Sequence, residues 1–295
     1  MHMMLALDES RYAESIIRWV AAFPRPERTR LTLIHVLEPL DVSPALVPEI
    51  QNRIMRRRRT EGRELLKKAE RALRKRYPEI TSILREGLPA YELLKIGREL
   101  HPDIIVCGTR GLWAAKGLPL GSVSQRLVGY SPSSIMLVPA DLRRNRSLRV
   151  MLATDGSNGA KNAARLLSTF HGTRTVYVVT AVRPLDDREL GRRAASRKEF
   201  RQLREQILGD REAAAKRALD ETARMLNWSG TIVKKRTVLG HQAEALASIA
   251  GRERADLLVV GSRGLTGLRA QAVGSVSMAL AQQAPCCLLI AKPGV

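Results

Sequence analysis

The chain has 295 residues, of which 44% are hydrophobic and 27% are charged, and these are values of globular proteins. The net charge of +21 suits nucleic acid, an anionic membrane or a phosphorylated ligand as a partner, but a solvated basic surface also accounts for it. No apolar run reaches the ~18 residues that a membrane helix needs, so we expect a soluble protein that does not enter a membrane.

The N-terminal residues lack the basic start and the long apolar region of a signal peptide, which predicts a cytoplasmic protein. The three cysteines, Cys107, Cys286 and Cys287, lie in apolar runs, so we expect buried and inert thiols rather than a disulfide framework. Neither half of the chain shows metal-ligand spacing. The length leaves room for two domains that each bury a core.

The first half predicts alternating strands and helices, because short apolar runs alternate with segments of helical periodicity. The expected strands are Leu5–Leu7, Leu31–Leu37, Thr81–Arg85, Ile104–Cys107 and Ile135–Val138. The expected helices are Arg11–Phe23, Ile54–Tyr77, Pro89–Leu100 and Ser122–Val128.

The second half repeats this order. Gly87 matches Gly240 and Pro132 matches Pro285 at a constant displacement of 153 residues, so the last third of each half aligns without a gap. We therefore predict two α/β domains, 1–140 and 149–295, joined by a polar linker at 141–148. The expected elements of the second half are Val150–Thr154, Ala160–Phe170, Val176–Val182, Phe200–Leu226, Thr231–Val238, Leu257–Val260 and Cys287–Ala291.

A glycine pattern follows an apolar strand in each half and precedes a helix. It consists of Gly108, Gly111, nine residues, then Gly121 and Ser122, and it returns as Gly261, Gly264, nine residues, then Gly274 and Ser275. Glycines permit close approach of the backbone and positive φ, and a helix N-terminus offers free N–H groups to a phosphate. The pattern predicts a phosphate cradle at the carboxyl ends of the strands, with the serines as helix caps, although a tight turn is the alternative reading.

Charged residues repeat around this cradle. Arg110 matches Arg263 and Lys116 matches Arg269, and these cations either face phosphates or are solvated loop residues. Asp8 and Asp155 each follow a first strand in an Asp-x-Ser context. We expect them to contact a ligand at the point where the strand order reverses, although Asx turns are an alternative role.

Other polar residues receive structural interpretations. Asp103 and Asp256 precede strands at the opposite end of the sheet, where they are expected to cap a helix exit or a strand entry. His35 lies within a strand and is expected to be a core or edge histidine. None of the five histidines lies in repeat register, so we predict no histidine catalyst.

Together, the Asp-x-Ser turn, the second strand and the glycine pattern followed by valine resemble the universal stress protein family, in tandem over nearly the whole chain. The resemblance implies an α/β fold with two tandem doubly wound five-stranded parallel sheets of order 3-2-1-4-5 and helices on both faces. It also implies ATP as the ligand, with Asp8 and Val36 at the adenosine end in the first half. Ala181 fills the position of Val36 in the second half, and Val123 and Val276 also fit the pattern.

We predict a nucleotide-dependent regulator in the stress response rather than an enzyme. The sequence has no Walker loop and no other group that would activate water at the phosphates, so we name no catalytic residue and expect slow ATP hydrolysis to be incidental at most. We expect Mg²⁺ to be bound through the phosphates of ATP, without protein metal ligands. The alternative function is a basic scaffold that binds nucleic acid or an acidic protein independently of nucleotide.

Nucleic acid is not the favoured partner, because the basic residues between Arg56 and Arg76 encircle their helix and aromatic residues make up only 4% of the chain. A regulatory protein partner is expected but not identified. We also predict that the halves pair through their final strands, Ser134–Val138 and Cys287–Ala291, into an intramolecular pseudo-dimer, and that two chains could form a homodimer. Finally, Glu9 stands where the second half has Gly156, which disfavours phosphate in the first pocket, while Ala181 gives up apolar contact in the second. These effects oppose each other, so we expect the ATP affinities of the two sites to differ by less than about tenfold.

Overall fold

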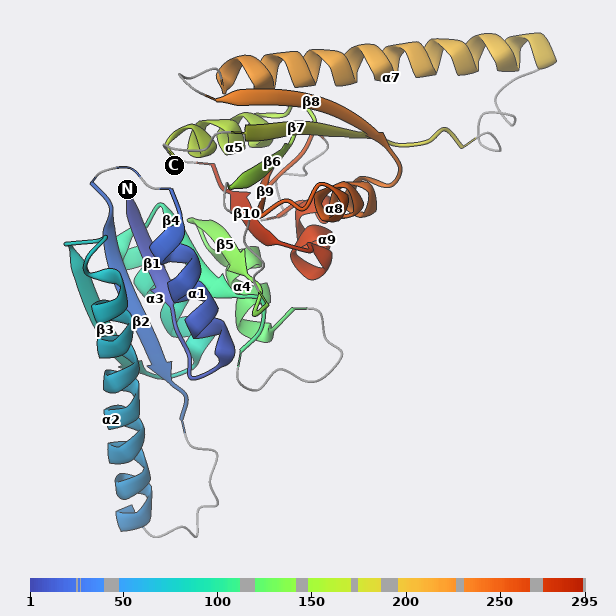
Figure 1. Cartoon of the computed structure of the whole chain (residues 1–295). Coiled ribbons are helices and arrows are strands. Elements are labelled where there is room, and N and C mark those ends of the chain that lie inside the picture. The colour runs from blue at the N-terminus through green and yellow to red at the C-terminus, as the bar shows by residue number, and fades with distance from the viewer. Residues whose placement is uncertain are drawn as a thin grey trace.

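The first half of the chain forms five strands and four helices in the alternating order that the sequence predicts (Figure 1). The computed structural model describes residues 1–24, 26, 28–39, 48–111, 120–141, 148–170, 175–186, 196–226, 231–265 and 273–293. The elements of the first half are β1 (His2–Ala6), α1 (Arg11–Ala22), β2 (Arg30–Leu37), α2 (Pro48–Leu73), β3 (Ile80–Glu86), α3 (Pro89–Leu100), β4 (Ile104–Gly108), α4 (Ser122–Tyr130) and β5 (Ser134–Val138).

The second half repeats this sequence of elements. They are β6 (Arg149–Ala153), α5 (Asn158–Ser168), β7 (Thr175–Val182), α7 (Arg197–Met225), β8 (Ile232–Leu239), α8 (Gln242–Arg252), β9 (Leu257–Gly261), α9 (Ser275–Gln283) and β10 (Cys287–Ala291). The predicted linker at 141–148 falls mainly on residues 142–147, which lie outside the described part of the chain.

The strands form one sheet in the order β3-β2-β1-β4-β5-β10-β9-β6-β7-β8. Each half therefore has the strand order 3-2-1-4-5, which confirms the predicted fold, and the two five-stranded sheets are joined edge to edge. All neighbouring strands within a half are parallel, whereas β5 and β10 are antiparallel. The strands of the two halves consequently run in opposite directions, and their carboxyl ends lie on opposite sides of the joined sheet along the strand direction.

The junction between the halves is a pseudo-twofold axis. Met136 of β5 lies opposite Leu289 of β10, and these residues occupy equivalent positions in the repeat because they are 153 residues apart. Ile135 pairs with Ile290, and Leu137 pairs with Leu288. All residues of both strands are buried. The predicted pairing of the final strands is confirmed, and it covers two apolar edges that would otherwise invite aggregation.

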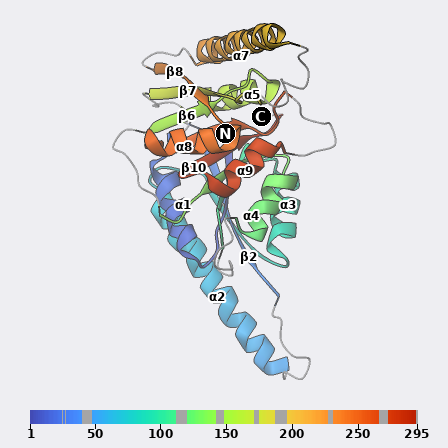
Figure 2. The same ribbon diagram turned by 90° about the vertical axis from the view of Figure 1, so that its right-hand side faces the viewer.

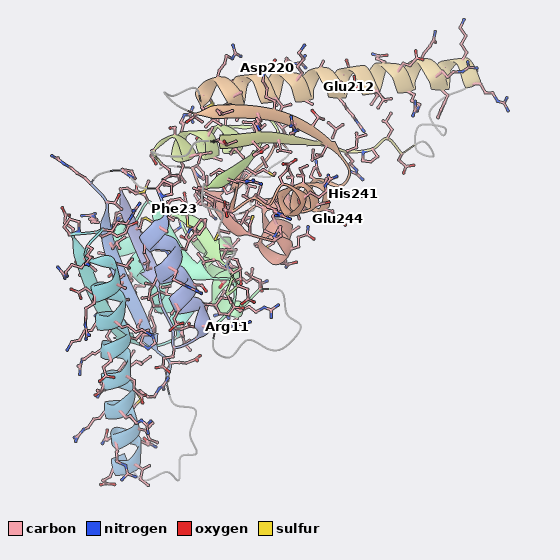
Figure 3. The ribbon with its side chains drawn as sticks, in the orientation of Figure 1. Arg11, Phe23, Glu212, Asp220, His241 and Glu244 are labelled. Carbon is pink, nitrogen blue, oxygen red and sulfur yellow. The ribbon has the colours of Figure 1, made fainter. Side chains whose placement is uncertain are left out.

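A second pair of equivalent residues meets on the same axis. The rings of Phe23, at the end of α1, and Phe170, after α5, lie 4.8 Å apart in an edge-to-face arrangement. Both side chains are fully buried, and Trp19 lies 5.6 Å from Phe23. Figure 3 shows Phe23 at the junction between the halves. Edge-to-face aromatic pairs are favourable beyond the area they bury, so this contact reinforces the strand pairing.

Helices cover both faces of the sheet, and the core is accordingly divided into two layers. One layer packs α1, α2, α5 and α7 against the sheet, and the other packs α3, α4, α8 and α9. Figure 2 shows this division in the first half, with α1 on one side and α3 and α4 on the other. The central strands are buried on both faces, which explains their continuous apolar sequences. Among the described helices, none is both long and apolar enough to cross a membrane.

Several element boundaries differ from the sequence-based expectations. The first strand begins at His2 rather than Leu5, because His2 is buried between its neighbours and its Nε2 lies 2.8 Å from Thr32 Oγ1. The long helix α2 begins at Pro48, before the expected Ile54, and ends at Leu73. Proline is well suited to the first turn of a helix, where its missing N–H has no partner to lose.

We predict that Phe170→Ala destabilises the protein by about 3–5 kcal/mol, since it opens a cavity on the axis between the halves. Chemical denaturation measures the change, and Phe200→Ala on the half-exposed part of α7 serves as the matched control. Equal destabilisation by the two substitutions would show that the Phe23–Phe170 contact contributes nothing particular to the junction.

Lys292 is an asymmetric feature of the junction, because its repeat equivalent is Pro139. Its Nζ donates a 3.0 Å hydrogen bond to the carbonyl oxygen of Val128, at the end of α4 in the other half. Burial, with a smaller contribution from the nearby Arg263 charge, lowers the pKa of Lys292 from 10.5 to about 8. The folded protein therefore disfavours the charged form of Lys292. Below pH ~8 the side chain is charged in both the folded and the unfolded protein, so the full cost of burying that charge lowers the stability there.

Linkage predicts that the stability of the parent protein rises relative to Lys292→Met as the pH increases from 8 to 10.5, because the unfolded chain then binds the additional proton. Denaturant titrations of both proteins at pH 7, 8.5 and 10 measure the difference. A constant difference across these pH values would contradict a lowered pKa at Lys292.

Candidate ligand pockets at the two glycine loops

Each half contains a cavity at the carboxyl ends of its strands, and the predicted site residues surround it. The first cavity has a volume of about 360 Å³ and the second about 450 Å³. The first is lined by Asp8, Val36, Gly108, Arg110, Gly111, Gly121, Ser122 and Val123. The second is lined by Asp155, Ala181, Gly261, Arg263, Gly264, Gly274, Ser275 and Val276. Lys116 and Arg269 lie outside the described residues.

The glycine loop is tied to the start of the following helix by one hydrogen bond. Gly121 is the N-cap of α4, and its N–H donates to the carbonyl oxygen of Thr109 at 2.8 Å. Gly274 caps α9 in the same way, with a 2.7 Å bond to the carbonyl oxygen of Ser262. The expected capping role of Ser122 and Ser275 is wrong, because both are the first residues inside their helices. The N-cap residues are glycines, so neither helix has a side-chain hydrogen bond at its N-cap.

This geometry leaves the first N–H groups of α4 and α9 without helical partners at the cavity. In any α-helix the first turn of N–H groups has no acceptor within the helix, and the helix dipole favours an anion there. Ser122, Val123, Ser275 and Val276 supply these groups and all line their cavities. Both cavities therefore present a ready anion-binding end.

A second serine in each helix holds the strand end in place, and the sequence analysis missed it. Ser124 Oγ donates to the carbonyl oxygen of Gly108 at 2.6 Å, and Ser277 Oγ donates to that of Gly261 at 2.7 Å. Both residues line their cavities. The repeated Ser-Val-Ser, at the same displacement as the glycines, was the available signal.

The glycines are required by close contacts rather than by unusual dihedral angles. A Cβ atom on Gly111 would lie 2.8 Å from Asp8 Oδ2, and one on Gly264 would lie 2.7 Å from Asp155 Oδ2. None of the described glycines of the pattern, which are Gly108, Gly111, Gly121, Gly261, Gly264 and Gly274, has a positive φ, so these positions do not use the left-handed conformation that glycine permits. The loop backbone and the aspartate carboxylate pack directly against each other in both halves.

The two aspartates have the structural role that the sequence analysis weighed as the alternative. Asp8 Oδ1 accepts hydrogen bonds from the N–H, at 3.1 Å, and the hydroxyl of Ser10. Asp155 Oδ1 accepts from the N–H of Ser157 at 3.0 Å, and its Oδ2 accepts from that of Leu265 at 3.1 Å. Each aspartate thus connects the first turn with the glycine loop and lines the cavity as well.

Asp103 and Asp256 lie at the opposite end of the strands, as expected. Asp103 Oδ2 accepts the backbone N–H of His2 at 2.6 Å, and Asp256 Oδ2 accepts that of Arg149 at 2.8 Å. Both are strand-entry caps and belong to neither cavity.

His35 distinguishes the first cavity from the second. It is buried, its Nδ1 lies 2.9 Å from the carbonyl oxygen of Leu7, and its Nε2 lies 3.7 Å from Glu9 Oε1. Gly62 makes room for the ring, because a Cβ there would lie 2.7 Å from His35 Cδ2. The expectation of a core histidine is confirmed, and Glu9 has an imidazole beside it that the sequence analysis did not consider.

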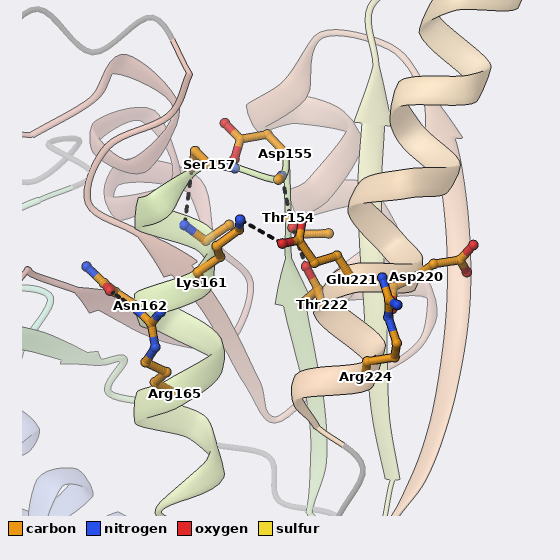
Figure 4. Close-up of polar contacts among 12 residues, drawn as sticks. Thr154, Asp155, Ser157, Lys161, Asn162, Arg165, Asp220, Glu221, Thr222 and Arg224 are labelled. Carbon is orange, nitrogen blue, oxygen red and sulfur yellow. Dashed lines mark hydrogen bonds and ion pairs between the residues drawn. The ribbon is translucent and has the colours of Figure 1, made fainter.

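The second half fills the same space with a different pair of side chains, since a smaller residue replaces the histidine and a larger one replaces the glycine. Thr180 and Ala215 stand at the repeat positions of His35 and Gly62. The turn also differs, because Gly156 adopts a φ of +78° whereas its counterpart Glu9 has no positive φ. Figure 4 shows the hydrogen bond of 2.8 Å between Thr154 and Thr222 that joins this turn to α7.

An arginine from each long helix reaches the end of the second strand, and the sequence analysis did not select it. Arg58 Nη1 donates to the carbonyl oxygen of Glu38 at 2.7 Å, and Arg211 Nη1 donates to that of Arg183 at 2.6 Å. Arg58 lines the first cavity, which therefore contains a cation from α2 in addition to Arg110.

The described residues contain no cluster of three His, Cys, Asp or Glu side chains that could hold a metal ion. The anion-binding groups are backbone N–H donors and arginines, which do not ligate cations.

Comparisons with known proteins agree with the repeat. The model of the "Universal stress protein family" matches residues 1–139 and again 147–292. Universal stress protein Rv2623 of Mycobacterium tuberculosis is 24% identical over 98% of this chain and 95% of its own length. A universal stress protein of Thermus aquaticus is 33% identical over 46% of this chain and 96% of its own length. The crystal structure of a universal stress protein from Archaeoglobus fulgidus covers 99% of this chain and 98% of its own, with a TM-score of 0.63 and 18% identity.

The contact between the glycine loop and the aspartate gives a testable prediction. Gly111→Ala should destabilise the protein by about 1–3 kcal/mol, because its methyl group would collide with the Asp8 carboxylate. Asp8→Ala combined with Gly111→Ala should destabilise less than the sum of the single changes, since the shorter side chain removes the collision.

Gly129→Ala in α4 is the matched control for thermal or chemical denaturation. A Cβ at Gly129 meets nothing within 4 Å, so this helical substitution should stabilise the protein by about 0.5–1 kcal/mol. Additive effects of the Asp8 and Gly111 changes would show that the two residues do not press on each other.

Proposed function

Because the chain belongs to the universal stress protein family over both of its halves, we propose that it is a regulator that binds one molecule of ATP in each cavity. The observation that carries this proposal is the repeated meeting of a glycine loop, an open helix N-terminus and an arginine at one end of each cavity. Cavities of this volume suit a small molecule whose phosphates require an anion-binding end.

The residues around the cavity divide into two groups in this proposal. The N–H groups at the starts of α4 and α9 bind phosphate oxygens, and Arg110 and Arg263 balance their charge. Val36 and Ala181, at the ends of β2 and β7, contact the adenine ring. Asp8 and Asp155 accept a hydrogen bond from the ribose or the adenine amino group, because a carboxylate oxygen can accept more than one hydrogen bond.

Mg²⁺ is part of the proposal as an ion that ATP brings into the cavity. Its role there is to screen the phosphate charges, while the protein supplies the backbone donors and arginines. We propose regulation rather than catalysis as the purpose of binding, with ATP hydrolysis slow and incidental. The protein partner that reads the nucleotide state, association into homodimers and a cytoplasmic location stay predictions.

The two cavities are expected to bind ATP with similar affinities. The Glu9 carboxylate opposes phosphate charge in the first cavity, but the guanidinium group of Arg58 lines the same cavity and offsets that repulsion. Ala181 offers less apolar surface to the adenine than Val36, which at ~25 cal/mol per Å² amounts to about 1 kcal/mol. These effects oppose each other, so the two dissociation constants should differ by less than about tenfold.

Calorimetric titration of nucleotide-free protein with ATP and Mg²⁺ tests this proposal. We expect a stoichiometry near two for the parent and near one for both Gly121→Val and Gly274→Val. A branched side chain would disturb the loop, because even a Cβ at Gly121 would lie 3.2 Å from Arg110 Cα.

Gly129→Val in the same helix is the control, since its side chain enters open space away from the cavity. Circular dichroism checks that each variant is folded. If the double variant Gly121→Val/Gly274→Val is folded and binds ATP like the parent, the glycine loops are not the phosphate site.

A further inference from the structure

Helix α2 carries a line of exposed cations that the repeat does not explain. At 100° per residue, Arg53, Arg56, Arg63, Lys67 and Arg71 fall within an arc of about 80° on the helix surface. All five side chains are exposed. They span about 27 Å at a rise of 1.5 Å per residue. We call these five residues the α2 stripe.

The other cations of α2 differ from the α2 stripe because each of them bonds to a carboxylate or to a backbone carbonyl oxygen. Arg57 pairs with Glu61, Arg59 with Glu86 and Lys68 with Glu14, while Arg58 bonds to the carbonyl oxygen of Glu38. Within the described residues, none of the five stripe cations lies within 4.0 Å of a carboxylate oxygen. Glu64 and Glu70 border the stripe on its two sides, and Glu70 is paired with Arg74. Glu49 lies on the stripe's own face, one turn before Arg53. The sequence shows cations all around this helix, but the structure leaves one face with unbalanced charge.

The fold does not require this charge, because the equivalent helix lacks it. The buried residues Gly62, Leu66 and Ala69 of α2 correspond to Ala215, Leu219 and Thr222 of α7 at the constant displacement, so the two helices pack in the same register. The positions of α7 that match the stripe are Gln206, Gly209, Lys216, Asp220 and Arg224. Asp220, labelled in Figure 3, is moreover paired with Lys235.

The position of the stripe leaves it open to a large partner. Figures 1 and 2 both show α2 at the margin of the molecule, with its N-terminal part projecting beyond the sheet. The opposite face of α2 is packed against the core through Leu66, Ala69 and Leu73. The helix therefore has no apolar face in this region to insert into a bilayer, as an interfacial helix would need.

We propose that the α2 stripe binds the phosphate backbone of double-stranded nucleic acid, independently of base sequence and of the nucleotide cavities. The helix has no aromatic residue, which argues against stacking on the bases of a single strand. The stripe itself holds no apolar or aromatic anchor of the kind that dominates protein interfaces. A straight row of cations nearly as long as one duplex turn of ~34 Å matches a rigid line of phosphates.

Fluorescence anisotropy with a labelled 24-base-pair duplex of arbitrary sequence tests the proposal at several salt concentrations. The test variant replaces Arg53, Arg56, Arg63, Lys67 and Arg71 with Gln, which preserves helix propensity. The control variant removes the same number of charges from the exposed surface of α7 by replacing Arg197, Lys198, Arg201, Arg204 and Arg217 with Gln.

We expect the test variant to lose at least about tenfold in affinity and the control variant to lose less than about threefold. The slope of log K against log salt should become shallower by about 4.5 for the test variant, because five phosphate contacts disappear at ~0.9 each. Unchanged circular dichroism and ATP titration show that the test variant is folded, so the loss belongs to the stripe.

Two outcomes would overturn the proposal. Equal weakening by both variants would mean that net charge, rather than the stripe, attracts the duplex. Tighter binding of the parent to phosphatidylserine vesicles or to poly-glutamate than to the duplex, at the same salt, would assign the stripe to a membrane surface or an acidic protein. A matching RNA duplex identifies which kind of double strand is preferred.

Discussion

The antiparallel pairing of β5 with β10 determines the arrangement of the whole molecule. Each half ends in a predominantly apolar outer strand, and such a strand exposes both its side chains and its hydrogen-bonding groups until it is paired. The two strands satisfy each other about an axis on which equivalent residues meet, Met136 with Leu289 and Phe23 with Phe170. Because the pairing is antiparallel, the carboxyl ends of the strands point in opposite directions in the two halves. The two cavities therefore open at opposite ends of the strands and form two separate sites rather than one shared site.

The two halves of the chain keep equivalent contacts, although different residues make them. Glu14 of α1 pairs with Lys68 of α2, and at the equivalent positions Lys161 of α5 pairs with Glu221 of α7, as Figure 4 shows. The charges are exchanged and the contact between the first and the long helix persists. His35 with Gly62 and Thr180 with Ala215 form a similar exchange of volume. By contrast, α7 has no row of cations equivalent to the α2 stripe. We therefore relate the stripe to a partner outside the chain rather than to the fold.

Much of the fold could be predicted from the sequence, because strands buried on both faces have continuous apolar runs and the repeat supplies two copies of every signal. The glycine pattern also led to the loop residues that line both cavities, whereas Val36 and Ala181 were named only through the family resemblance. Local patterns could not predict which contacts make those glycines necessary. The carboxylate of Asp8 reaches Gly111 only through the fold, and the cap of α4 is Gly121 because its N–H bonds to Thr109 across the loop. The sequence analysis did not select Arg58 either, because its place at the cavity, beside the carbonyl oxygen of Glu38, also arises only through the fold.

The central claim is that one chain presents two equivalent nucleotide sites built on a duplicated glycine loop. Native mass spectrometry of the purified protein in the presence of ATP and Mg²⁺ tests it most directly, because it counts ligands on each chain. The structure predicts that the most highly occupied species carries two ATP molecules per chain. A protein that stays free of ATP, or that never binds more than one, would contradict the equivalence of the two cavities.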